Sequence, residues 1–208
     1  MRVDELTFSQ ARELRTGSLM PGEIKAKLQD WGFELAGAGM YSEVWHSSSG
    51  NVVVKISKGK PDRCWMIFAQ YARQNPNPHL PKIGKISTPR IDNTEYFIVF
   101  LEKLDNFDPR HYNLTQGQWG SMIHDAHIAM MDGDWERIYN SSDVDPEYED
   151  YFLYRDKIPQ SFWKTVNTLY HNLPEGCGPD MHFGNIMARG NTPVIIDPYA
   201  AAMMHLDM

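Results

Sequence analysis

The chain has 208 residues, and its 20 basic and 27 acidic side chains give a formal net charge of −7. A hydrophobic fraction of 42% with 6 Trp, 10 Tyr and 9 Phe can fill the core of one domain, with one lobe or two, and excludes a disordered chain. The acidic balance argues against sequence-independent nucleic-acid binding, which needs clustered Lys and Arg. The first fifteen residues lack the apolar core of a signal peptide, and no run approaches the roughly 20 apolar residues that span a bilayer. With only two cysteines and no CxxC pair, the sequence predicts a protein of the reducing cytoplasm.

The N-terminal half of the chain predicts a small antiparallel sheet. Apolar residues set among glycines lead into a β-branched run, which indicates two or three antiparallel strands over 31–56. A proline-rich loop at 75–81 precedes another apolar strand at 96–101. The helices expected in this half, from capping residues and apolar residues at helical spacing, lie at 4–15, 21–30 and 61–73.

The C-terminal half predicts helices followed by a hairpin. After a connector at 105–109, the pattern is helical, with a tyrosine-rich acidic stretch at 143–156 that is either helix or partly loop. The helices are expected at 116–131 and 159–172, and the two hairpin strands at 185–188 and 193–196. The resulting plan is α+β, with an N-terminal helical extension at 1–30, a first lobe at 31–103 and an abbreviated, mostly helical second lobe at 104–208.

The first motif with chemical content is a glycine-containing segment followed by a lysine. The segment is Leu35-Ala-Gly-Ala-Gly-Met-Tyr-Ser-Glu-Val44, and Lys55 follows on a predicted strand. Glycines let the backbone approach closely, so that N–H groups can cover phosphate oxygens while Lys55 supplies a point charge. Ser42 stands where the pattern G-x-G-x-x-G would place a third glycine. A phosphate-covering loop and a plain hairpin turn therefore both remain open from these residues alone.

The second motif is Gly178-Pro-Asp180-Met-His182-Phe-Gly184-Asn185-Ile-Met187. Asp180 can orient an attacking hydroxyl or accept its proton, and Asn185 can offer a neutral oxygen to Mg²⁺. The alternative is a capped turn in which both side chains satisfy backbone groups.

The third motif is Val194-Ile-Ile-Asp197-Pro198. It places Asp197 across the predicted hairpin from Asp180, so that both carboxylates face one end. Two close carboxylates are costly unless a cation is present. A simple cap by Asp197 is the alternative. The ordered set of glycine loop, strand lysine, connector, Asp-x4-Asn, hairpin and Asp favours a single phosphotransferase site.

This order of motifs resembles that of the protein-kinase-like superfamily. The Asp-Met-His-Phe-Gly-Asn segment is more similar to the catalytic loop of aminoglycoside and choline phosphotransferases than to the H-R-D loop of eukaryotic-type kinases. Over about residues 31–200 the chain most resembles the early serine/threonine protein kinases of short-tailed lytic bacteriophages. The likeness is specific in two blocks, Gly32–Ser42 and Asp180–Pro198.

The resemblance implies a two-lobed, protein-kinase-like fold with an antiparallel-sheet N-lobe. It also implies ATP- and Mg²⁺-dependent transfer of the γ-phosphoryl group to Ser or Thr of host proteins, in the host cytoplasm. Asp180 would be the catalytic Asp, Lys55 would contact the α- and β-phosphates, and Asn185 and Asp197 would hold Mg²⁺. The other residues implied to contact the nucleotide are Gly37, Ala38, Gly39, Met40, Tyr41, Ser42 and Val44 near the phosphates, and Glu102 and Leu104 at the adenine hinge.

Departures from the kinase pattern leave two alternatives open. The predicted helix after Lys55 has no Glu to pair with it, and Asp62 is the only acid near its start. This favours a pseudokinase-like protein that binds and inhibits a host factor. The short stretch after Asp197 leaves no room for an activation segment, which favours a small-molecule kinase of the aminoglycoside or choline type.

Histidines add less specific signals. His182 is implied by the resemblance to fix the catalytic loop by hydrogen bonding, although a structural core histidine is the simpler interpretation. His124 and His127 stand three residues apart on a predicted helix. This is a spacing that zinc helices use, but a solvated helix face is expected instead.

Overall fold

The computed structural model describes residues 21–39, 42–48, 50–60, 62–91 and 93–201. This part of the chain is mixed α+β, with six α-helices and antiparallel strands. It divides into two compact units. Unit 1 holds the described residues up to Pro76 together with Pro81–Lys103, and unit 2 holds Asn77–Leu80 and the described residues from Leu104 onward. The predicted helix at 4–15, and Met40 and Tyr41 of the glycine segment, lie outside the described residues.

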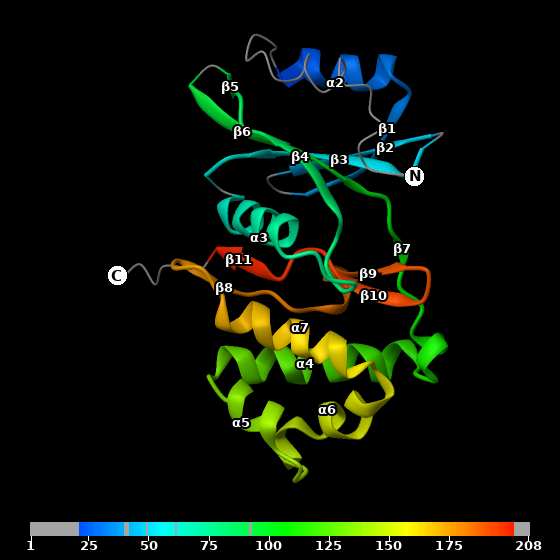
Figure 1. The fold of residues 1–208 in the computed structure, drawn as a ribbon, viewed down its shortest axis with the longest axis vertical. Helices are drawn as coiled ribbons and strands as arrows, with labels where there is room; N and C mark the ends of the chain where they lie inside the picture. Colours follow the sequence, from blue (N-terminus) through cyan, green and yellow to red (C-terminus); the bar gives the residue numbers. More distant parts are fainter. Residues whose placement is uncertain (1–20, 40–41, 49, 61, 92, 202–208) are drawn as a thin grey trace. The chain divides into compact units, whose positions relative to one another are not determined.

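Unit 1 is built on an antiparallel sheet with strand order β1-β2-β3-β6-β4, and β5 pairs with β6 (Figure 1). The strands are β1 Phe33–Ala38, β2 Ser42–Ser47, β3 Val52–Lys58, β4 Ile83–Ser87, β5 Arg90–Ile91 and β6 Thr94–Glu102. The strands predicted within 31–56 and at 96–101 are thus confirmed. The sequence did not predict β4, which has glycine and lysine between its two isoleucines. It becomes a strand by pairing with the apolar β6.

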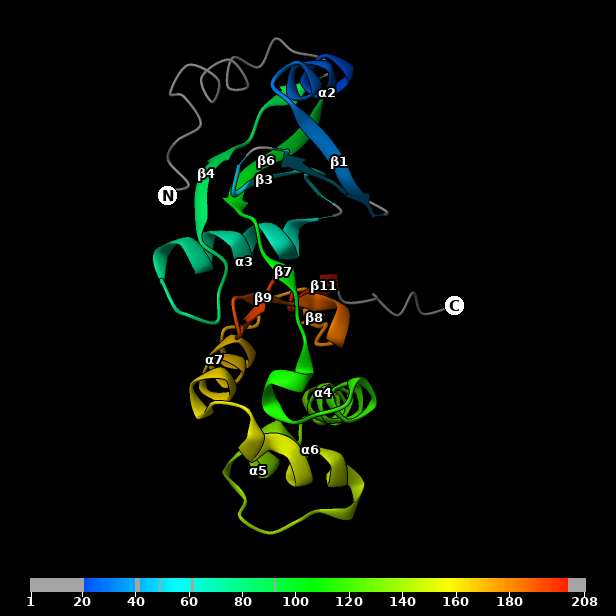
Figure 2. The ribbon, with the colours of Figure 1, turned by 90° about the vertical axis from the view of Figure 1, so that its right-hand side faces the viewer.

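Helices α2 (Pro21–Asp30) and α3 (Arg63–Gln74) cover opposite faces of this sheet, as Figures 1 and 2 show. Side chains alternate between the faces of a strand. Val54 and Ile56 of β3 therefore pack into one hydrophobic cluster with Ile24 and Leu28 of α2. Lys55 lies on the other face of β3, toward α3. The helix predicted at 21–30 is confirmed and contributes directly to the core.

Unit 2 is mainly helical. Its α-helices are α4 Gln116–Met131, α5 Trp135–Asn140, α6 Glu149–Tyr154 and α7 Gln160–His171. A capping box between Thr115 and Gln118 begins α4, and the helices predicted at 116–131 and 159–172 are confirmed. The short helix α5 was not predicted, and its Trp135 is fully buried against other aromatic rings. No helix in the described ranges is both long and apolar enough to cross a bilayer.

Five short strands complete unit 2, and Figure 2 shows them on the side of α4 and α7 opposite α5 and α6. They are β7 Asp105–Asn106, β8 Cys177–Pro179, β9 Ile186–Arg189, β10 Thr192–Ile195 and β11 Tyr199–Ala201. β9 and β10 form the predicted hairpin, whose turn contains Gly190 at φ 59°, a left-handed value that suits glycine. β7 adds to β9, and β8 pairs with β11. The predicted connector at 105–109 thus begins as a strand.

His79 ties the loop 77–80 to unit 2. Burial lowers the pKa of His79, so the ring is neutral near pH 7. Its Nδ1 lies 2.8 Å from the Pro193 carbonyl oxygen and its Nε2 lies 2.8 Å from Ser161 Oγ. A neutral ring therefore donates from Nδ1 and accepts at Nε2. The Ile195 N–H also donates to the His79 carbonyl at 2.9 Å, so this loop supports the hairpin just before Asp197.

Candidate active site

The loop after β8 carries Asp180 and Asn185, and hydrogen bonds within it bring the two together. The Asn185 Nδ2 donates to the Asp180 carbonyl oxygen at 2.8 Å and to Asp180 Oδ2 at 3.3 Å. Because these bonds commit the amide nitrogen, the Asn185 Oδ1 is the atom left to accept a donor or bind a cation. Both side chains are only partly buried, so they can meet a ligand.

Asp197 is fixed beside the same loop through its two chain neighbours. The Ile196 N–H donates to the Asn185 carbonyl at 2.9 Å, and the Pro198 carbonyl accepts the Asp180 N–H at 2.7 Å. Asp197 stands between these two anchored residues and is itself partly buried. The structure therefore brings together Asp180 and Asn185 of the second sequence motif and Asp197 of the third.

The donor chemistry of this cluster suits Mg²⁺. Among the residues that the structure describes, no group of three or more His, Cys, Asp or Glu side chains could hold a metal ion on its own. Mg²⁺ in nucleotide enzymes usually keeps several waters and takes one or two carboxylates plus substrate phosphates. The Asp197 carboxylate and the free Asn185 amide oxygen provide that partial set.

His182 is not a core residue, so the interpretation of it as a structural core histidine is wrong. Its side chain is 52% exposed, and its Nδ1 accepts the Gly184 N–H at 3.1 Å. It thereby caps the short 3-10 helix Phe183–Asn185. A Cβ added at Gly184 would lie 2.9 Å from the His182 ring, so a side chain there would displace the ring from this position. The expected hydrogen bond that fixes the loop is therefore present, made from an exposed position.

The expectation that His124 and His127 lie on a solvated helix face is wrong for His127. His124 is exposed, but His127 is partly buried, and its Nδ1 has no hydrogen-bond partner among the described residues. Burial lowers the pKa of His127, and the nearby Asp180 carboxylate acts in the opposite direction. A neutral imidazole thus lies close to Asp180. The sequence signal for it was the His124/His127 pair, whose inward face only packing could identify.

Lys55 finds its partner within unit 1. Its Nζ lies 3.4 Å from Asp62 Oδ2 and 3.8 Å from the centre of the Trp65 ring. The side chains of Lys55 and Asp62 are only 10% and 15% exposed, so this ion pair is largely shielded from water. Asp62 stands at the N-cap of α3 and makes no side-chain capping bond. The Asp62 carboxylate, which could cap α3, instead faces Lys55. α3 itself carries no Glu that could pair with Lys55.

The described residues of the glycine segment lie in β1, at Gly39 directly after it, and in β2. The Gly39 N–H donates to the Ser42 carbonyl at 2.8 Å, and the pairing register shifts between Leu35 and Gly37. Val44 lies opposite Lys55 on the neighbouring strand. No atom lies within 4 Å of a Cβ built on Gly37, and its φ is not positive. The described residues therefore leave room for a side chain at position 37.

The predicted hinge residues lie where the two units meet in the sequence. Glu102 is buried in unit 1, and its Oε1 accepts the Lys82 N–H at 2.7 Å. Leu104 is buried in unit 2. Because the Glu102 N–H also donates to the Lys82 carbonyl at 3.1 Å, Glu102 holds the residue before β4 to the end of β6.

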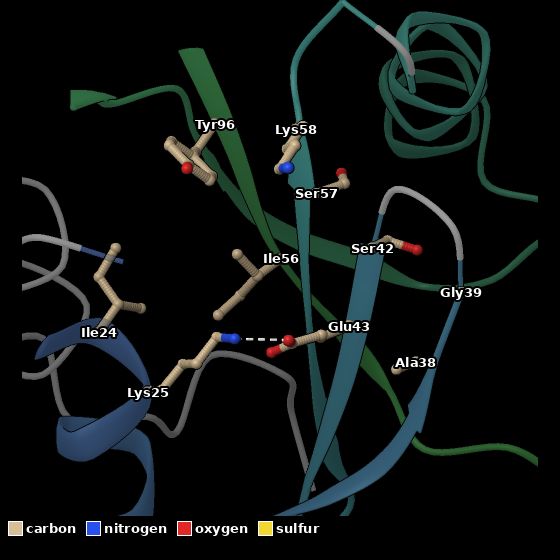
Figure 3. A pocket seen from close by; sticks show the side chains of 10 residues that line it. All are labelled: Ile24, Lys25, Ala38, Gly39, Ser42, Glu43, Ile56, Ser57, Lys58 and Tyr96. Carbon is tan, nitrogen blue, oxygen red and sulfur yellow. Dashed lines mark hydrogen bonds and ion pairs between the residues drawn. The ribbon is translucent and has the colours of Figure 1, made fainter. Parts of the chain in front are cut away.

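A pocket of about 290 Å³ lies in unit 1 on the face of the sheet that α2 covers (Figure 3). Ala38, Gly39 and Ser42, three residues predicted to contact the nucleotide, line it, but Lys55 does not. The pocket is therefore separate from the Lys55–Asp62 pair on the opposite face of β3.

Comparison with known proteins gave no match that bears on this site. No protein-family model matches the chain, and no curated protein matches it.

Proposed function

We propose that the chain is an ATP- and Mg²⁺-dependent kinase of the two-lobed, protein-kinase-like type that phosphorylates Ser or Thr of host proteins. The observation that carries the proposal is the grouping of Asp180, Asn185 and Asp197 in unit 2. Asn185 donates to Asp180, and the chain neighbours of Asp197 are hydrogen-bonded to the backbone of Asp180 and Asn185. In unit 1, the shielded pair of Lys55 and Asp62 adds support, since it is a charge arrangement suited to phosphate binding.

In this proposal each residue has one task. Asp180 orients the attacking hydroxyl and accepts its proton, while Asn185 and Asp197 bind the Mg²⁺ that accompanies the phosphates. Lys55 neutralises phosphate charge, and the Asp62 carboxylate holds its ammonium in place. Catalysis then comes mainly from positioning and charge stabilisation.

A small-molecule kinase is the second candidate. The loop that carries Asp180 has the D-x-H-x-x-N form of aminoglycoside and choline phosphotransferases, and His182 caps the 3-10 helix that follows. A pseudokinase-like inhibitor is a weaker candidate, because a binding protein has no need of all four residues Lys55, Asp180, Asn185 and Asp197.

The first experiment separates these candidates. Purified protein is incubated with ATP labelled on the γ-phosphate, Mg²⁺ and a host-cell lysate, beside an Asp180→Ala control. Labelled protein bands that depend on Asp180 support the protein kinase. If no protein is labelled while ATP raises Tm, a small-molecule acceptor is favoured. If ATP does not bind, the kinase proposal is wrong.

Asp197→Asn should weaken the apparent affinity for Mg²⁺ in the presence of ATP by about tenfold or more, because a carboxylate ligand becomes a neutral amide. A Mg²⁺ titration of transfer activity at fixed ATP measures the shift. Asp156→Asn is the matched control, since the Asp156 side chain is 94% exposed. Equal Mg²⁺ midpoints in Asp197→Asn and the parent would count against Asp197 as a ligand.

His127→Ala should lower kcat about tenfold, equivalent to about 1.4 kcal/mol, with little change in KM for ATP. The reason is that the Asp180 carboxylate acts to raise the pKa of His127, so the two groups interact electrostatically and loss of the ring changes the surroundings of that carboxylate. His124→Ala, on the exposed side of α4, is the control. Steady-state kinetics of both variants decide the point, and an equal loss in both would mean that the effect is not specific to His127.

A further inference from the structure

The pocket beneath α2 is here called the α2 pocket. Its lining suits a ligand, and the proposed reaction does not use it. Its apolar wall consists of Ile24, Ile56 and the partly buried ring of Tyr96 (Figure 3). At about 290 Å³ its volume is near the lower end of ordinary ligand pockets, about 300–1,000 Å³. The pocket therefore suits a small ligand with a planar apolar body.

The charges around the α2 pocket leave one positive group available. The Glu43 carboxylate accepts Lys25 Nζ at 2.5 Å and Trp45 Nε1 at 3.2 Å, so Lys25 is neutralised by its own partner. Lys58 also lines the pocket and makes no ion pair with another described residue. One unopposed ammonium beside an aromatic ring favours a ligand with a single negative charge.

We propose that the α2 pocket binds a small aromatic monoanion and that its occupancy raises affinity for Mg²⁺·ATP. The effect on the affinity for Mg²⁺·ATP rests on the proposed function. A ligand in this pocket would touch Ala38, Gly39 and Ser42, the backbone that would also cover the phosphates. Holding this backbone in place couples the two ligands, and such coupling is reciprocal.

A pair of matched dyes tests the site directly. The anionic probe is 8-anilinonaphthalene-1-sulfonate, and the neutral one is N-phenyl-1-naphthylamine, which lacks only the sulfonate. Lys58→Gln should weaken binding of the anionic dye by about two- to fivefold, the scale of an exposed ion pair, and leave the neutral dye unchanged. Lys60→Gln, an exposed lysine that does not line the pocket, should leave both unchanged.

A filling variant tests the location. Ala38 is exposed at the end of β1, so Ala38→Phe can occupy the pocket without disturbing the core, and it should weaken both dyes by about tenfold or more. Fluorescence titration gives each Kd, and circular dichroism verifies the fold. If neither dye saturates, or if Ala38→Phe and Lys58→Gln bind both dyes as the parent does, the proposed site is wrong.

The coupling between the α2 pocket and Mg²⁺·ATP is tested by a separate measurement. Saturating Mg²⁺·ATP should lower the Kd of the anionic dye by about fivefold. If ATP raises Tm but leaves this Kd unchanged, the coupling is wrong while the site stands. If ATP does not raise Tm at all, the proposed kinase function and the coupling both fail, and the dye titrations with the variants still decide whether the α2 pocket is a binding site.

Discussion

Asp180→Ala should lower the rate of phosphoryl transfer by about 10²–10⁴-fold, the usual contribution of a positioned general base, while nucleotide binding persists. The fold should survive because the main anchors of the loop are backbone atoms. The Asn185 Nδ2 bond to the Asp180 carbonyl and the Asp180 N–H bond to Pro198 do not involve the Asp180 side chain. Among the described residues, the variant loses the 3.3 Å contact of Asn185 with Asp180 Oδ2 and the 3.9 Å approach of His182 Nε2 to Asp180 Oδ1.

Two further variants separate charge from shape in this experiment. Asp180→Asn keeps the shape of the side chain but cannot accept a proton, so it should be nearly as inactive as Asp180→Ala. Asp156→Ala removes a carboxylate from an exposed position of unit 2 and should retain full activity. Transfer is measured at saturating ATP, and ATP binding by the rise in Tm. Substantial activity in Asp180→Asn would remove Asp180 from the role of base.

Lys55→Met should abolish transfer and also destabilise unit 1 by about 3–5 kcal/mol, the usual cost of breaking a buried ion pair. The cost arises because Asp62 stays shielded, with its side chain 15% exposed and its Oδ2 without a hydrogen bond among the described residues. The ammonium of Lys55 offsets the burial of that carboxylate. Urea denaturation of the variant and the parent measures the loss in free energy of unfolding.

The double variant Lys55→Met with Asp62→Asn distinguishes stability from catalysis. Removal of the unpaired charge should restore most of the lost stability, while transfer stays absent because the Lys55 ammonium proposed to contact the phosphates is still missing. Lys60→Met, at an exposed lysine, is the control and should change neither property. A double variant as unstable as the single one would mean that Lys55 stabilises unit 1 through contacts other than Asp62.

Much of the fold could be predicted because local pattern and tertiary packing agree. Helices α2 and α4 begin and end where the sequence predicted, since helical spacing of their apolar residues and the Thr115 capping box act locally. The strands missed by prediction, such as β4 and β7, carry no strong apolar alternation. β4 becomes a strand by pairing with the apolar β6, and β7 by pairing with β9, which is distant in sequence.

For the candidate site too, some features could be predicted from the sequence and others depended on the tertiary structure. The types and order of Lys55, Asp180, Asn185 and Asp197 were determined by the sequence, because phosphate and Mg²⁺ chemistry limits the residues that can serve. Tertiary structure decided their partners. The pairing of Lys55 with Asp62, the inward placement of His127 and the exposure of His182 depend on which face of a strand, helix or loop is buried. Burial is a property of the packed chain, and a single sequence carries only a weak trace of it.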